Sequence, residues 1–251
     1  MSSHFSTIGF PVRNMEEYWA LAKRAAEAGV RNAAADGSAL VRWAVDSGPE
    51  IWSHLNRGGD VLGAVPFFST GTSYRMSVTG TGDDPDEEME GWIDGWLEPS
   101  EDDEPYSGAF PLRISLVNYA LARSRLGVLP SVHRLELVAL AHEADLFKDE
   151  AGYASAPGEI YRVPIGSFVS SAHFAADDEE KAFSEATALL TGRIVSARLL
   201  TNPATSEPFR WVQVTVGAVT LHTFADRETL EGEPLEGQIL GGSFWLLGRL
   251  L

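Results

Sequence analysis

The residues best suited to chemistry in this sequence are histidines with acids nearby, and the first such group lies in residues 49–55, PEIWSHL. If this segment is a strand, Glu50, Trp52 and His54 share one face, because side chains alternate across a strand. They could therefore point together into a cleft. A carboxylate and an imidazole four residues apart on a strand are separated by roughly 13 Å, too far to bind one metal ion. The sequence thus predicts hydrogen-bonded side chains here and no metal site.

A second candidate is the segment His142-Glu143-Ala144-Asp145, which begins like the helix of a zinc protease. The second histidine of that motif is missing, since position 146 is Leu. The sequence also lacks the glycine-rich motifs that bind phosphates or dinucleotides and the G-x-S-x-G motif of serine hydrolases. We therefore predict no catalytic residue and no cofactor, and a binding or interaction protein rather than an enzyme.

A third group lies near the carboxyl end, where residues 193–200, 209–216 and 219–225 alternate between apolar and polar side chains as strands do. Trp211 and Gln213 fall opposite the valines of their strand, and Arg198 and His222 fall on the polar side of the neighbouring strands. Aromatic stacking beside arginine is how small β-barrels hold single-stranded nucleic acid or sugars. These four residues are the predicted binding face. The alternative is that its aromatic residues pack against the N-terminal domain.

The last part of the chain resembles an OB-fold. The resemblance rests on three expected strands, a short helical turn at residues 226–230, and the sequence LEGQILGGSFWLLGRL at residues 235–250. In that fold, glycines let a small barrel turn its corners, so Gly241 and Gly242 are expected to separate the last two strands. The resemblance implies a small OB-like β-barrel over residues 181–251.

The first part of the chain predicts a βαβββ unit. A strand is expected at residues 5–12, a helix at 15–28 capped by Asn14 and ended by Gly29, and strands at 39–45, 50–55 and 61–68. A looser copy follows about 70 residues later, with a strand at 74–79, a helix at 86–96 and strands at 109–117 and 132–141. Residues 145–153 predict a further short helix. We expect an α+β domain over residues 1–180, possibly a degenerate pair of units at 1–70 and 71–180, and a linker at 175–180, AADDEE.

The βαβββ unit resembles the vicinal-oxygen-chelate superfamily, which includes glyoxalase and antibiotic-resistance proteins. The resemblance rests on residues 4–18, HFSTIGFPVRNMEEY, and on residues 49–55. It implies a cleft around Thr7, Glu50, Trp52 and His54, and an enzyme of this type is the alternative prediction. Thr7 stands where the metal enzymes of the superfamily place a histidine or glutamate, so the metal chemistry is expected to be absent.

The charge is uneven and limits the partners. The formal net charge is −17, and residues 81–180 carry 22 acidic and 6 basic side chains, a net −16. Such a field repels phosphate backbones, so nucleic acid is not expected on the acidic N-terminal part, although the nearly neutral barrel could bind it. The sequence has no cysteine and no apolar run of about 20 residues, and we expect no signal peptide. We expect a cytoplasmic protein with no membrane contact and with a small ligand or a protein as its partner.

Overall fold

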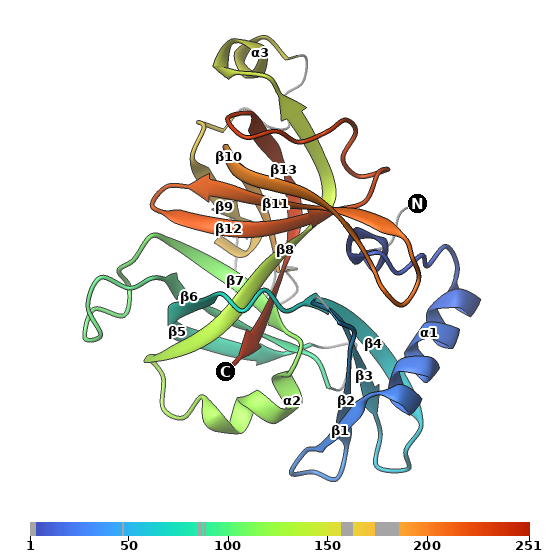
Figure 1. Ribbon diagram of the computed structural model, residues 1–251. Helices are drawn as coiled ribbons and strands as arrows, with labels where there is room; N and C mark the ends of the chain where they lie inside the picture. The colour runs from blue at the N-terminus through green and yellow to red at the C-terminus, as the bar shows by residue number, and fades with distance from the viewer. Residues whose placement is uncertain (1–3, 47, 85–86, 88, 157–162, 174–185) are drawn as a thin grey trace.

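The computed structural model describes residues 4–46, 48–84, 87, 89–156, 163–173 and 186–251. The fold is mixed α and β, rich in strands, with few helices (Figure 1). None of the helices in the described part of the chain is long and apolar enough to cross a membrane.

A small N-terminal layer consists of one helix on a four-stranded sheet. Its elements are α1 (Met15–Ala28), β1 (Val30–Ala33), β2 (Ala39–Ala44), β3 (Pro49–Leu55) and β4 (Val61–Phe68), with the strands antiparallel in the order 1-2-3-4. The Asn14 side chain accepts a hydrogen bond from the Glu17 backbone N–H at 2.9 Å, so the predicted helix start is confirmed. The Ser53 hydroxyl donates to the Ala22 carbonyl, which fixes α1 on the sheet face turned away from the rest of the molecule (Figure 1).

The strand predicted at residues 5–12 is wrong. Residues Ser6–Ile8 form a 3-10 turn, η1, and Gly9 follows it with a positive φ of 78°. The Asn202 side chain donates to the Ile8 carbonyl and Thr205 donates to the Gly9 carbonyl. The apolar residues of this segment are buried as predicted. They are inserted between the layers rather than paired in a sheet. Alternation of apolar and polar residues alone cannot distinguish a buried strand from a buried irregular segment.

The remaining strands form one nine-stranded sheet. They are β5 (Ser73–Asp83), β6 (Gly91–Leu97), β7 (Phe110–Leu116), β8 (Ser131–Phe147), β9 (Ser167–Ser170), β10 (Thr187–Thr201), β11 (Pro208–Val216), β12 (Val219–Ala225) and β13 (Ile239–Leu250). The short helices α2 (Tyr119–Ala122) and α3 (Glu150–Ser155) lie in the connections, as do the 3-10 turns η2 (Arg123–Arg125) and η3 (Ser171–His173). Strands β8 and β13 pair antiparallel over most of their length.

This long pair closes two rings of strands. Strands β10, β11, β12, β8 and β13 are hydrogen-bonded in a circle, and so are β8, β5, β6, β7 and β13. Each ring contains one short parallel contact, between β12 and β8 in the first and between β13 and β7 in the second. The first ring therefore needs a strand from residues 131–147. The division expected at residue 180 does not coincide with the strand pairing, and the linker expected at 175–180 lies outside the described residues.

The helix expected at residues 86–96 is also wrong where the structure describes it, because Gly91–Leu97 is the strand β6. A β-carbon on Gly95 would lie 2.0 Å from the Ser77 carbonyl oxygen, so this glycine lets β6 approach β5. Glycine also weakens a helix. The helical spacing of the apolar residues nevertheless favoured a helix over a strand at this segment.

Two smaller differences from the expected elements lie further along the chain. Strand β8 continues to Phe147, so α3 begins only at Glu150, and residues 226–230 form a turn rather than a helical turn.

The expected barrel corner at Gly241 and Gly242 is an uninterrupted part of β13. A β-carbon on Gly242 would lie 2.3 Å from the Glu143 carbonyl oxygen, so this glycine permits close strand pairing rather than a corner. The irregularity of β13 comes one step later, between Ser243 and Phe244.

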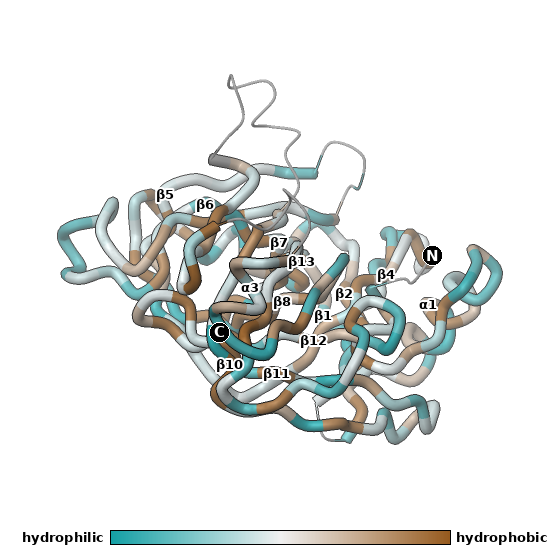
Figure 2. Tube along the Cα trace, turned by 90° about the horizontal axis from the view of Figure 1, so that it is seen from above, coloured by the Kyte–Doolittle hydropathy of each residue, from teal (hydrophilic) through white to brown (hydrophobic). Residues whose placement is uncertain are grey.

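Two large apolar clusters and a small one hold the fold. The first fills the rings with side chains from β5–β8 and β10–β13, the second lies between the small layer and the large sheet, and the small one lies between α1 and the small sheet. In the second, Phe68 of β4 stacks on Phe224 of β12 at a centroid distance of 4.4 Å. Figure 2 shows hydrophobic residues along the central strands and hydrophilic ones on the peripheral loops.

Candidate functional site

The predicted binding face lies on the outside of β10, β11 and β12. The three strands occur where the sequence predicted them, and Val212 and Val214 point into the core. Register places Trp211 beside Arg198 of β10, and Gln213 beside His222 of β12. The structure therefore brings all four predicted residues onto one face.

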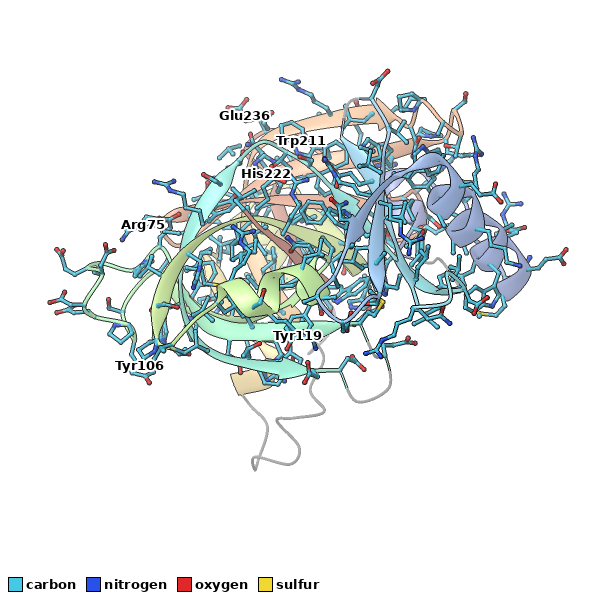
Figure 3. The ribbon with its side chains drawn as sticks, turned by 90° about the horizontal axis from the view of Figure 1, so that it is seen from below. Arg75, Tyr106, Tyr119, Trp211, His222 and Glu236 are labelled. Carbon is cyan, nitrogen blue, oxygen red and sulfur yellow. The ribbon has the colours of Figure 1, made fainter. Side chains whose placement is uncertain are left out.

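The Trp211 indole is fixed in place by its neighbours. Its Nε1–H donates to Nδ1 of His222 at 3.0 Å (Figure 3). The Arg198 guanidinium lies over the ring, 5.3 Å from its centroid. His222 is 5% exposed, and burial lowers the pKa of its imidazole below the ordinary value of 6.5. A neutral His222 with an unprotonated Nδ1 is the form that can accept this hydrogen bond.

Part of the same face is covered by the small layer. Phe209 and Phe224 are fully buried, and both contact Phe68, at centroid distances of 6.0 and 4.4 Å. Trp211 lies at the edge of this contact and remains partly exposed, as does Gln213, whereas Arg198 is exposed. The expected alternative, packing of the aromatics against the N-terminal part, therefore holds in part, because Trp211 and Trp245 both pack against the apolar cluster between the layers and stay partly exposed.

The residues of the alternative cleft have separate partners. Thr7 is on η1 rather than on a strand, and its hydroxyl donates to the His4 carbonyl at 2.6 Å. Glu50 accepts hydrogen bonds from the Trp52 indole and from Arg42 Nε, each at 2.9 Å. His54 is 3% exposed, with Nδ1 3.3 Å from Glu90. Thr7, Glu50, Trp52 and His54 are all buried.

Glu50 belongs instead to an ionic network between the layers. Arg249 of β13 lies 3.4 Å from Glu50 and donates to Glu136 of β8 at 2.7 Å. Arg249 also donates to the Ser69 hydroxyl at 3.2 Å, and the backbone N–H of Gly71 donates to Glu136 at 2.9 Å. The network thus joins the small sheet, the large sheet and the segment that connects them. An arginine inside the apolar run FWLLGRLL was the one sequence signal for it.

A histidine pair lies at the start of the described chain. His4 Nε2 is 2.8 Å from His142 Nδ1, and the His4 ring packs against Trp245 at 4.9 Å. Burial, and secondly the charge of His142, lowers the pKa of His4 to about 4. The described residues contain no group of three or more histidines, cysteines or acids that could hold a metal ion.

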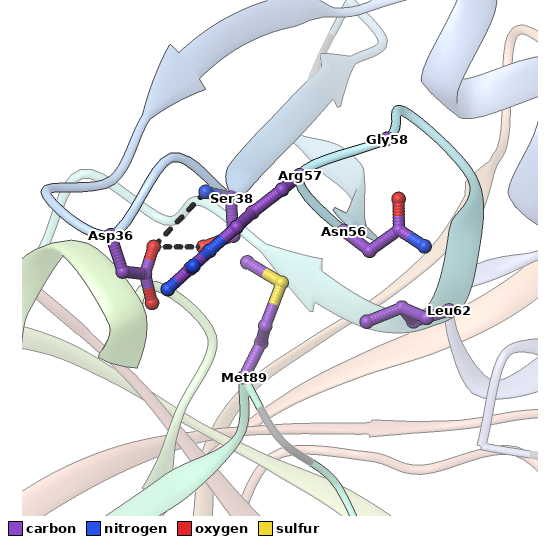
Figure 4. Close-up of a pocket in the computed structure, with 7 residues that line it drawn as sticks. All are labelled: Asp36, Ser38, Asn56, Arg57, Gly58, Leu62 and Met89. Atoms are coloured by element: carbon purple, nitrogen blue, oxygen red, sulfur yellow. Dashed lines mark hydrogen bonds between the residues drawn. The ribbon is translucent and has the colours of Figure 1, made fainter.

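A cavity of about 410 Å³ lies at one end of the small sheet. Its walls come from the β1–β2 turn with Asp36 and Ser38, the β3–β4 loop with Asn56, Arg57 and Gly58, and from Leu62 and Met89 (Figure 4). The sequence predicted a turn at residues 56–60 and no feature at the β1–β2 turn. The one feature in the sequence that could have indicated a site here is Arg57, which is followed by two glycines.

A scan against protein-family models found no match, and neither a search of the curated proteins nor one of the solved structures found a similar protein.

Proposed function

We propose that this chain is a binding protein that holds a neutral oligosaccharide on the outer face of β10, β11 and β12. The observation that carries the proposal is the Trp211 indole, which is partly exposed and held by a hydrogen bond to a buried histidine. An aromatic platform that is fixed before the ligand arrives loses little entropy on binding.

The chemistry of this face suits a sugar. The flat side of a pyranose ring is lined by C–H groups, which pack on an indole as other apolar surfaces do. The Arg198 guanidinium over the indole and the Gln213 amide two residues further along β11 can donate hydrogen bonds to hydroxyl groups, and Gln213 can also accept them. A sugar has no charge for this acidic protein to repel.

Single-stranded nucleic acid is the second ligand that such a face accommodates. The overall charge of −17 opposes a polyanion, since like charges lower the rate of encounter and the affinity. We therefore favour the neutral ligand.

The proposal includes an OB-like barrel made of β10–β13 and closed by β8. Barrels of that type bind oligosaccharides and oligonucleotides on the face of their second and third strands, and β11 and β12 would take those positions here. Cytoplasmic location remains a prediction from the sequence.

Calorimetric titration with cellohexaose, maltohexaose and a ten-residue oligothymidylate tests the proposal. We expect one of the two sugars to bind, and the variant Trp211→Ala to weaken binding about 10-fold or more, the usual effect of losing a stacking platform. Arg198→Ala, a change at an exposed residue, provides a second variant that should fold normally.

Trp43→Ala is the matched control, because Trp43 is also partly exposed and lies under an arginine, Arg24, at 5.0 Å. It should leave sugar binding unchanged. The proposal fails if neither sugar binds, or if Trp211→Ala and Trp43→Ala behave alike. Binding of the oligothymidylate alone, weakening with salt, would replace the sugar with nucleic acid.

A further inference from the structure

We propose that the cavity between the β1–β2 turn and the β3–β4 loop is a second binding site, which takes a free α-amino acid with an apolar side chain. This site is independent of the Trp211 face. It is carried by the placement of opposite charges beside an apolar wall in a cavity of about 410 Å³. That volume is within the range of pockets that hold small ligands.

Both loops of the cavity are held in shape by their own hydrogen bonds. Asn56 donates to the Asp60 carboxylate and accepts from the Asp60 backbone N–H, each at 2.9 Å. In the opposite turn, the Ser38 backbone N–H and hydroxyl donate to Asp36 Oδ1 at 3.0 and 2.5 Å. The site therefore exists before a ligand enters it.

The cationic group of the site is Arg57. Among the described residues it takes part in no hydrogen bond or ion pair, and its aliphatic stem passes over Gly37, where a β-carbon would lie 3.6 Å from Arg57 Cγ. Figure 4 shows Arg57 lying across the cavity toward Asp36. A guanidinium with unused donors binds a carboxylate through two parallel hydrogen bonds.

The anionic group is Asp36. The hydrogen bonds from Ser38 hold the pKa of its carboxyl below the usual value, with smaller contributions from Arg123 and Arg57. Oδ1 is occupied by Ser38, while Oδ2 has only the long 3.4 Å contact with Arg123. Oδ2 can therefore accept from an ammonium group that lies next to a carboxylate bound by Arg57.

The third component is apolar. Met89 is 5% exposed and lies with Leu62 on the same cavity, where they offer a surface for an aliphatic side chain. A neighbouring positive and negative group with an apolar wall matches an α-amino acid, whose carboxylate, ammonium and side chain all leave one carbon. A simple carboxylate or a simple amine would leave one of the two charges unused.

Titrations followed by amide chemical shifts test this inference with three probes. L-leucine carries both charges, 4-methylpentanoate lacks the ammonium group, and 3-methylbutylamine lacks the carboxylate. We expect leucine to shift the amides of residues 36–38 and 56–59, and to bind at least 10-fold more tightly than either analogue.

Arg57→Gln and Asp36→Asn should each weaken leucine binding about 10-fold or more. Arg31→Gln, at an exposed position of β1 outside the cavity, should have no effect. The inference is overturned if leucine leaves these amides unshifted, if 4-methylpentanoate binds as tightly as leucine, or if Arg57→Gln leaves the affinity unchanged. None of these variants touches the Trp211 face, so unchanged amide resonances of β10–β12 serve as the check that each variant is folded.

Discussion

At the scale of single residues, the contact between Trp211 and His222 makes binding depend on pH. Nδ1 of His222 must be free of a proton to accept the indole hydrogen bond. Since burial holds the pKa of His222 below 6.5, the bond is intact at neutral pH and is lost as pH falls through the lowered value.

We therefore expect the oligosaccharide affinity to be constant from about pH 8 to 6.5 and to fall several-fold at the lower pH at which His222 takes up a proton. Calorimetric titrations at a series of pH values measure it. In His222→Gln the affinity should vary little with pH, because the amide does not titrate. An affinity of the unmodified protein that stays unchanged while the His222 imidazole resonances show protonation would show that the contact is unimportant for binding.

His4 makes the stability of the fold depend on pH in the same range. Its pKa is about 4 in the folded chain and about 6.5 in the unfolded chain, so the unfolded state binds more protons between these values. Stability is therefore complete above about pH 6.5 and falls as the pH drops toward 4.

We expect protonation of His4 in the unfolded chain to lower the free energy of unfolding by roughly 1–2 kcal/mol between pH 7 and pH 5. Urea unfolding at pH 7 and pH 5 measures the loss, and His4→Gln should show a smaller difference between the two pH values. Equal differences in both proteins would mean that other groups cause the acid sensitivity.

At the scale of elements, periodicity correctly predicted the helices and strands whose sequence pattern fits only one type of secondary structure. Helix α1 had a cap, a periodic apolar face and a terminating glycine. Strands β2–β4 were apolar segments set off by turn residues, and strands β10–β12 alternated between apolar and polar side chains. Strand β6 has apolar residues at positions that fit a helix as well. Only its packing against β5, at Gly95, decides between the two, and a single sequence does not show that packing.

Gly95→Ala should therefore destabilise the protein by about 1–3 kcal/mol or more, because the new β-carbon would meet the rigid Ser77 backbone. Gly80→Ala on the partner strand is the control. Its β-carbon would lie 3.6 Å from Asp94, an ordinary contact, so only a small change is expected. Thermal and urea unfolding compare the two variants, and equal stability would refute this role for Gly95.

At the scale of the whole molecule, the candidate site was partly predictable from the sequence. Alternation placed Arg198, Trp211, Gln213 and His222 on one face, and it did not show that Phe209 and Phe224 on that face are covered by β4. Nor did it show that β8 closes the ring. Contacts between residues so distant in the chain leave no local pattern, and Glu50 and Arg249, 199 positions apart, illustrate this.

The ionic network between the layers gives a prediction at this scale. Arg249→Met would leave Glu50 and Glu136, with side chains 1% and 4% exposed, without one of their cations. Removing one member of a buried ionic group costs about 3–5 kcal/mol. Urea unfolding at pH 7 measures the cost.

The double variant Arg249→Met/Glu136→Gln should regain part of that loss, because it also removes one of the uncompensated charges. If Arg249→Met unfolds within about 1 kcal/mol of the unmodified protein, the network does not hold the layers together.

The most direct test of the proposed function is the indole N–H resonance of Trp211, assigned with Trp211→Phe, during titration with cellohexaose and maltohexaose. We predict that this resonance shifts progressively and saturates with one of the sugars, while the corresponding resonance of Trp43 stays in place. A Trp211 resonance that remains unmoved at saturating sugar, or that moves together with Trp43, would contradict the proposed binding face.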